Sequence, residues 1–149
     1  MVSFETLYNL FLSSISSYTF AQLTDEEVQA ELFNLAVRAI AKFKFPKVPL
    51  TYTLNETDYQ YYFDNEIGFR ELEVLLSHMK VAWIEFQISK EERLTNQYYD
   101  SNVRTFSMGN IIAQLNRMYE NFYSAAKQAE YNYSRVSATG KPRIGDINE

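Results

Sequence analysis

The chain is poor in the residues that build most compact chemical sites. Its 149 residues include no cysteine, four glycines, three prolines and one histidine. Without cysteine the chain has no disulfides and no thiolate metal sites. The glycines form no Gly-x-Gly-x-x-Gly, phosphate-loop or Gly-x-Ser-x-Gly motif, so the usual backbone geometry for nucleotide binding and hydrolase chemistry is missing. We therefore expect no enzymatic activity, no cofactor and no metal ion.

Long apolar runs and an excess of basic charge are also missing. No stretch reaches the length of a membrane-spanning helix, and the first twenty residues lack the basic start and unbroken apolar run of a signal peptide. The net charge of -5 and the pI near 5.0 argue against a broad basic surface for nucleic acid. We expect a protein with no membrane partner, made and used in the cytosol or in a particle assembled there.

What the chain has in excess is aromatic residues. They make up 16% of the sequence, with 12 Tyr and 11 Phe against one Trp. Tyrosine offers a large contact area at low rotamer cost, so an excess is often used at protein interfaces. A tyrosine-rich core explains the same composition equally well, and composition alone leaves both interpretations open.

Charge is distributed unevenly along the chain. Between Thr51 and Asp100 there are ten acidic and four basic residues, and a short basic run precedes this segment. The basic run consists of Arg38, Lys42, Lys44 and Lys47. The two segments are suited to meet head to tail in a ring, and the alternative interpretation is that each charge lies on a solvated face.

Apolar spacing and capping signals predict an all-α fold, a four-helix-type bundle. Ser3 can cap a first helix that fades into the serines at 13–17, and Thr24 with Glu27 forms a capping box for a second. Pro46 forbids a continuation of the second helix. A third helix opens at 65 or 68, and the last runs from 107 to about 134, roughly 40 Å. We expect one helical domain at 1–136 and a flexible tail at 137–149.

The third helix is predicted to be the central one, because two apolar stripes lie side by side on it and leave little polar surface. One stripe contains Leu72, Leu75, Leu76, Met79, Trp83 and Phe86, and the other contains Val74, Val81, Ile84 and Ile88. The apolar residues that the last helix places at core spacing are Ile111, Ile112, Leu115, Met118, Tyr119, Phe122, Ala125, Ala126, Ala129 and Tyr133. The predicted core residues are Leu72, Leu76, Met79, Trp83 and Phe86 from the third helix, with Leu115 and Phe122 from the last.

Three segments are candidates for binding a partner. Residues 51–64 are rich in tyrosine and predict a hairpin or an ordered extended arm that must lean on the helices or on a neighbouring subunit. A polar loop is predicted from 90 to 105, with a docking surface there and Phe106 folding back to cap the bundle. The C-terminal tail is the third segment. The candidate interface residues are Tyr52, Tyr59, Tyr61, Tyr98, Arg104, Lys141 and Arg143.

The single histidine, His78, invites a metal or acid–base interpretation, because Glu71 and Glu85 lie seven residues to either side and share its stripe. Metal sites in helical bundles need Glu-x-x-His on facing helices, and the residue three before His78 is Leu75. We therefore expect a structural histidine that is partly exposed or hydrogen-bonded.

The arrangement of apolar, aromatic and small polar positions over about half of the chain resembles the small head–tail connector proteins of tailed bacteriophages. These are the adaptor or neck subunits that ring the portal exit. The positions that carry the resemblance are Phe63, Leu72-Glu73-Val74-Leu75-Leu76, Met79, Trp83, Gln87-Ile88, Tyr99-Asp100-Ser101 and Phe106-Ser107.

The resemblance implies a non-enzymatic virion protein that forms a homo-oligomeric ring. Its implied partners are the portal protein and the adjacent neck or tail completion protein, with DNA passing transiently through the channel. The Tyr-rich insertion at 51–64 and the Met108-Gly109 start of the last helix depart from the family pattern, so the exact neck position stays open. The alternative function is a soluble helical adaptor or regulator that binds a partner protein in a groove between helices.

Overall fold

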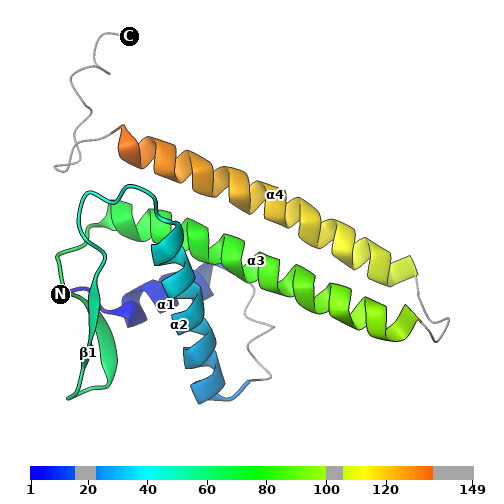
Figure 1. Ribbon diagram of the computed structural model, residues 1–149, viewed down its shortest axis with the longest axis horizontal. Helices are drawn as coiled ribbons and strands as arrows, with labels where there is room; N and C mark the ends of the chain where they lie inside the picture. The colour runs from blue at the N-terminus through cyan, green and yellow to red at the C-terminus, as the bar shows by residue number, and fades with distance from the viewer. Residues whose placement is uncertain (16–22, 100–105, 136–149) are drawn as a thin grey trace, which may run out of the picture.

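The computed structural model describes residues 1–15, 23–99 and 106–135 of the chain. Within these ranges the protein is mostly helical, with a small antiparallel hairpin and a long C-terminal helix that packs on the third helix, as predicted (Figure 1). The elements are α1 (Phe4–Ser14), α2 (Asp25–Lys42), β1 (Tyr52–Asn55), β2 (Gln60–Phe63), α3 (Phe69–Tyr99) and α4 (Phe106–Ser134). The predicted tail at 137–149 lies outside the described residues.

The first two helices begin where the capping signals predict. The Ser3 side chain accepts the backbone N–H of Thr6 at 3.3 Å. At the start of α2 both halves of the capping box are present: Glu27 N–H donates to the Thr24 hydroxyl at 3.3 Å, and Thr24 N–H donates to Glu27 Oε2 at 2.8 Å. Local sequence therefore sets these helix starts.

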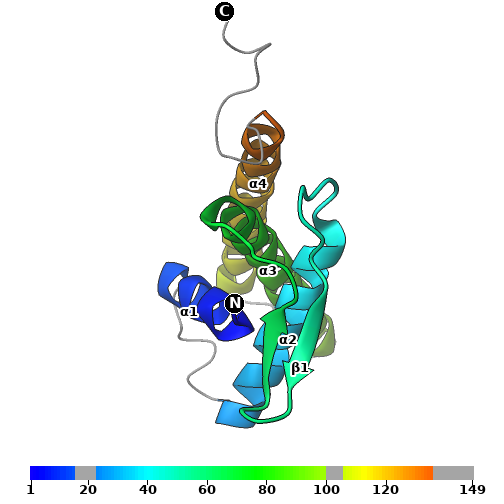
Figure 2. The same ribbon diagram turned by 90° about the vertical axis from the view of Figure 1, so that its left-hand side faces the viewer.

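Helix α3 is the central element, as predicted. Seen along the molecule in Figure 2, α1 and α2 lie on one side of α3 and α4 lies on the other. Both of its apolar stripes are buried over its first four turns, because each faces a different neighbour. The buried side chains of α3 are Leu72, Val74, Leu75, Met79, Val81, Ala82, Trp83 and Ile84.

The polar loop predicted from Lys90 to Thr105 is wrong over its first ten residues, because α3 continues as a helix to Tyr99. No glycine or proline occurs between these two residues, and most of the polar residues there are good helix formers. Helix α4 begins at Phe106 rather than after a cap at Ser107. Residues 100–105 lie outside the described part of the chain.

The Tyr-rich segment forms the hairpin rather than an extended arm. Strands β1 and β2 pair antiparallel, with Tyr52 opposite Phe63 and Asn55 opposite Gln60. The hairpin packs against helices of the same chain, because a two-stranded hairpin is barely stable alone in water. Phe63 is fully buried, and its ring centroid lies 4.8 Å from that of Phe4 in α1. Its N–H donates to the carbonyl of Val2 at 3.0 Å, so the N-terminus lies beside β2.

On α3, one predicted core residue is exposed and another is only half-buried. Leu72, Met79 and Trp83 are buried, and Leu76 is half-buried against the core. Phe86, however, is 40% exposed and is not a core residue. It lies on the same stripe as Met79 and Trp83, but it lines an open groove beside the start of α2 and does not face the core. The apolar stripe of α3 continues past Trp83, but the packed elements that cover it do not.

Helix α4 buries only a narrow stripe. The side chains that reach the core are spaced three and four residues apart in alternation, as in a two-helix coiled-coil seam. They are Leu115, Tyr119, Phe122, Ala129 and Tyr133, with Ala126 buried at the same spacing. The predicted core positions Ile111, Met118 and Ala125 are instead exposed, because a helix with a single neighbour covers one seam and leaves its flanks open. Leu115 and Phe122 are half-buried, so their predicted core role holds only at its edge.

The molecule thus has two regions. The body comprises α1, α2, the hairpin and residues 69–84 of α3, and it holds nearly all of the buried side chains. The projecting helical pair comprises residues 85–99 of α3 and 106–122 of α4. Its near end borders α2, and its far end extends beyond α1 and α2 (Figure 1). Among the side chains described in this pair, none is fully buried.

Candidate functional site

Two of the predicted interface tyrosines pack within the body. Tyr52 and Tyr61 are half-buried in an aromatic cluster with Phe4 and Phe33. The Phe33 and Tyr61 rings stack with centroids 4.6 Å apart, and the Phe4 and Tyr52 centroids are 5.0 Å apart. Their main contribution is to hold the hairpin against α1 and α2. Part of the tyrosine excess is therefore used in the core.

Tyr59 stands apart from these two. Its side chain is 78% exposed, and it is the one non-glycine residue with a positive φ, 56°, in the described part of the chain. It ends the turn between β1 and β2, a position where a left-handed backbone is usually supplied by glycine. A large aromatic side chain in this conformation and in solvent is a candidate contact with a partner.

Polar contacts hold this turn rigid. Asn55 accepts the Thr57 N–H through Oδ1 at 2.8 Å, and its carbonyl accepts the Tyr59 N–H at 2.8 Å. Asp58 accepts the Gln60 N–H at 3.0 Å and the Tyr62 hydroxyl at 2.7 Å. The hydrogen bond from Tyr62 is the main reason that the pKa of the Asp58 carboxyl lies below its usual range, while the same bond raises the pKa of Tyr62.

The other predicted interface residues fall on segments about which less is described. Tyr98 lies in α3 and not in a loop, and its side chain is outside the described part of the structure, as is that of Phe106. Arg104, Lys141 and Arg143 also lie outside the described residues. Their predicted roles therefore stay predictions.

A cavity with a basic rim lies between the end of α2, the middle of α3 and the second half of α4. Its volume is about 290 Å³. Val81 and Ala126, both buried, form an apolar floor. The remaining residues of the lining are mostly polar or charged: Ala41, Lys42, Lys44, His78, Tyr123, Lys127 and Glu130. An apolar floor with a few charged groups at the rim is typical of a binding site.

The lysines around this cavity are differently engaged. Lys42 pairs with Glu85 across the α2–α3 contact at 3.2 Å. Lys127 Nζ lies 4.7 Å from the centroid of the Tyr123 ring, a cation–π arrangement. Among the described residues, neither Lys44 nor Lys127 takes part in an ion pair. The rim therefore offers two cations to a carboxylate.

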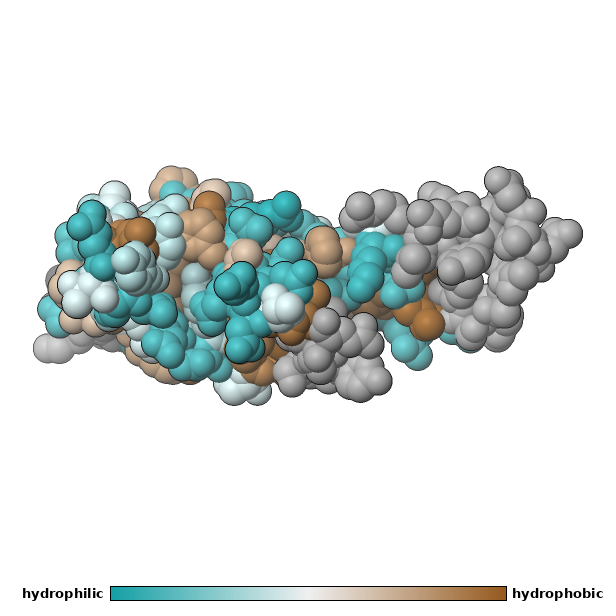
Figure 3. Space-filling view, turned by 90° about the horizontal axis from the view of Figure 1, so that it is seen from below, coloured by the Kyte–Doolittle hydropathy of each residue, from teal (hydrophilic) through white to brown (hydrophobic). Residues whose placement is uncertain are grey.

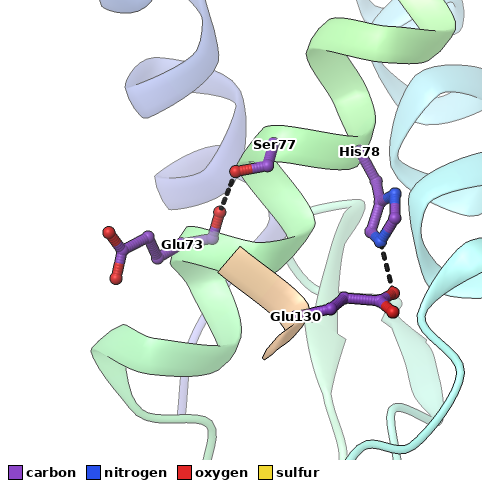
Figure 4. A network of polar contacts seen from close by, with 4 residues as sticks. All are labelled: Glu73, Ser77, His78 and Glu130. Atoms are coloured by element: carbon purple, nitrogen blue, oxygen red, sulfur yellow. Dashed lines mark hydrogen bonds and ion pairs between the residues drawn. The ribbon is translucent and has the colours of Figure 1, made fainter. Parts of the chain in front are cut away.

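His78, on the wall of the cavity, has a structural partner. Its Nε2 lies 2.5 Å from Oε1 of Glu130, so the pair joins α3 to α4 (Figure 4). Figure 4 also shows Ser77, whose hydroxyl donates to the Glu73 carbonyl at 3.0 Å and faces away from this pair. The prediction of a hydrogen-bonded structural histidine is confirmed. Glu130 was missed, because one chain's sequence does not show which residues of α4 lie opposite α3.

Tyr133 anchors the other end of α4 to the body. Its ring lies edge-on to Phe43 with centroids 5.1 Å apart, and its hydroxyl accepts the Lys47 N–H at 2.8 Å and donates to Glu71 Oε1 at 3.1 Å. Burial is the main reason that the pKa of Tyr133 is raised, and the negative charge of Glu71 adds to it. Glu71 is therefore used in a contact between α3 and α4.

Apolar side chains also reach the surface of the projecting helical pair. Phe86 on α3 and Ile111 and Met118 on α4 are exposed. Figure 3 shows hydrophobic side chains on one face, both over the body and farther along the projecting pair. Exposed apolar side chains on helices that extend beyond the core are typical of surfaces that pack against another chain.

Within the described ranges, no group of three or more histidine and acidic side chains is placed to hold a metal ion. No described helix is long and apolar enough to cross a membrane. The sequence matches no protein-family model, and comparison with curated proteins and with solved structures returns no match.

Proposed function

We propose that the chain is a structural virion protein, a head–tail connector subunit that forms a ring at the portal exit and joins the portal to the neck or tail. The observation that carries the proposal is the projecting helical pair, in which none of the described side chains is fully buried. In an isolated chain this pair would gain little stability, because most helix stability comes from packing of an apolar face.

A ring of identical subunits supplies the missing packing. In a ring, each subunit presents one surface to the copy before it and a different surface to the copy after it, and the rotation closes. The exposed flanks of α4, with Ile111 and Met118, then pack against a neighbour. Stable interfaces of this kind bury roughly 800 Å² on each partner, an area that two helices of this length can supply.

The charge of the chain is compatible with a DNA channel. A net charge of -5 gives a wall that repels phosphate, so passing DNA is not retained by counterion release. The proposed partners are therefore other copies of this chain, the portal protein and the adjacent neck or tail completion protein. DNA is a transient partner, and the ring is assembled in the host cytoplasm as part of the virion.

Sizing tests the proposal directly. The purified chain is measured by light scattering, alone and mixed with a portal ring, and the mixture is imaged by electron microscopy. We expect a ring of subunits bound at the portal exit. A chain that stays monomeric under both conditions and leaves the portal bare would refute the proposal.

One observation favours a second candidate, a helical adaptor that binds a partner protein in a groove. A cavity of about 300 Å³ lies between the start of α2 and α3, and Leu23 and Phe86 line it with exposed apolar surface. Such a groove suits an amphipathic helix of a partner. The adaptor would remain monomeric and bind one partner chain, so the same sizing experiment separates the two candidates.

A further inference from the structure

The molecule is electrically polar along α2. Acidic residues gather at the N-terminal end of this helix, which begins Asp25, Glu26 and Glu27. The hairpin turn, with Glu56 and Asp58, lies at the same end: Tyr59 and Gln29 line one cavity, and in Figure 1 the turn and the start of α2 both lie at the lower end of the molecule. The opposite end carries the basic run and the basic-rimmed cavity. The 18 residues of α2 separate these ends by roughly 27 Å.

Opposite charges at opposite ends favour head-to-tail association of identical chains. The acidic end of one copy is complementary to the basic end of the next, whereas like ends repel. This contact is heterologous, so it generates a closed ring when the rotation between copies closes. The polarity therefore identifies a second copy of this chain as the occupant of the cavity.

Within the acidic end, the hairpin turn is the part whose shape and chemistry fit the cavity. It presents Tyr59 to solvent on a backbone fixed by hydrogen bonds, and Glu56 and Asp58 lie beside it. A phenol ring suits the apolar floor of Val81 and Ala126, and the carboxylates suit Lys44 and Lys127 at the rim. A preorganised turn loses little conformational freedom on binding.

We propose that the turn at residues 56–59 of one copy inserts Tyr59 into the cavity between α2, α3 and α4 of the next copy, where Lys44 and Lys127 bind its carboxylates. This contact is one part of the subunit interface of the ring, beside the exposed flanks of α4, and it therefore rests on the proposed function. It explains why an exposed tyrosine occupies a left-handed position that glycine would fill without strain.

Disulfide trapping tests the contact, because the natural chain has no cysteine and gives no background. Chains carrying Tyr59→Cys are mixed with chains carrying Lys127→Cys and oxidised at the concentration at which the wild type assembles. We expect a cross-linked dimer at several times the yield of the control mixture of Tyr59→Cys with Asn116→Cys. Asn116 is exposed on the same helix, α4, and lies outside the cavity. Equal yields from both mixtures would overturn the proposal.

Charge reversal provides a second measurement. The double change Lys44→Glu with Lys127→Glu should weaken assembly at least tenfold, measured by sedimentation, and the loss should shrink when these chains are mixed with chains carrying Glu56→Lys. Lys90→Glu, which matches the charge change of Lys127→Glu alone at an exposed site outside the cavity, should assemble like the wild type. Rising salt should weaken wild-type assembly, because the charges are solvent-accessible.

The outcomes separate this contact from the proposed function. If the wild type forms portal-bound rings and the cavity variants assemble equally well, the ring stands and this interface is overturned. If Lys127→Glu abolishes assembly and Tyr59→Ala does not, another segment occupies the cavity, and the proposal is also overturned. A wild type that forms no ring with or without the portal overturns both.

Discussion

Phe4 and Ile111 are both apolar residues in the first turns of a helix, yet they lie in opposite environments. Phe4 is fully buried, and the rings of Tyr8, Phe33, Tyr52, Tyr61 and Phe63 surround it. Ile111 is 43% exposed on the projecting helical pair. The difference lies in the number of layers, because α1 is covered by a helix, a hairpin and α3, whereas the start of α4 has α3 alone. Within one molecule, the body folds on itself and the pair extends from it.

The largest expected effect tests where the body ends. Trp83→Ala should lower the free energy of unfolding by about 3–5 kcal/mol, because its side chain is buried beside Phe11. Phe86→Ala, one turn farther along α3, should cost less than about 1 kcal/mol, since this ring is already exposed. Urea titration of both variants measures the difference. Similar losses would mean that the boundary between body and pair is misplaced.

A smaller effect is expected where α4 meets the body. Tyr133→Phe removes one hydroxyl and leaves the part-buried Lys47 N–H and the Glu71 carboxylate without that partner. The expected loss is about 1–3 kcal/mol by thermal or chemical unfolding. Tyr131→Phe is the matched control, because the hydrogen bond that its hydroxyl accepts from Arg135 at 3.2 Å is exposed. A loss in the control as large as in Tyr133→Phe would argue against this anchor.

Local sequence predicts some parts of this fold and fails for others. The caps at Ser3 and Thr24 depend on residues within one turn, so local sequence predicts them. The end of α3 was misjudged because a helix that is polar on most sides has the composition of a loop. The pairing of His78 with Glu130 joins residues 52 apart, and it depends on the register of two long helices that no local pattern specifies.

The body should lose stability at high pH. Burial raises the pKa of Tyr8 in the body above its ordinary value near 10, with smaller contributions from Tyr61 and Tyr52. Between the unfolded and the folded pKa, only the unfolded state loses this proton, so the stability present below about pH 10 falls as the pH rises. The decline should approach about 1.4 kcal/mol per pH unit for this one group.

Tyr8→Phe tests this dependence, since the variant keeps the ring and lacks the titrating hydroxyl. The difference in unfolding free energy between wild type and variant should be constant from pH 6 to 9 and should shift in favour of the variant above pH 10. Parallel curves throughout that range would show that Tyr8 titrates equally in both states.

The smallest expected effect concerns the ion pair at the border of the two regions. Lys42 and Glu85 join α2 to the beginning of the projecting pair, but both side chains are about 40% exposed. A double-mutant cycle with Lys42→Met and Glu85→Gln should give a coupling of about 0–1 kcal/mol. A coupling well above this range would mean that the border is more rigidly held than its exposure indicates.

Trp83 is the only tryptophan in the chain, and its indole Nε1 forms no hydrogen bond within the described residues. The single indole fluorophore therefore sits in an apolar environment between α1 and α3, remote from the tip of the projecting pair. Its emission therefore reports the integrity of the body, with no contribution from another tryptophan in the pair. Unfolding of the body can be followed in the assembled ring without any attached dye.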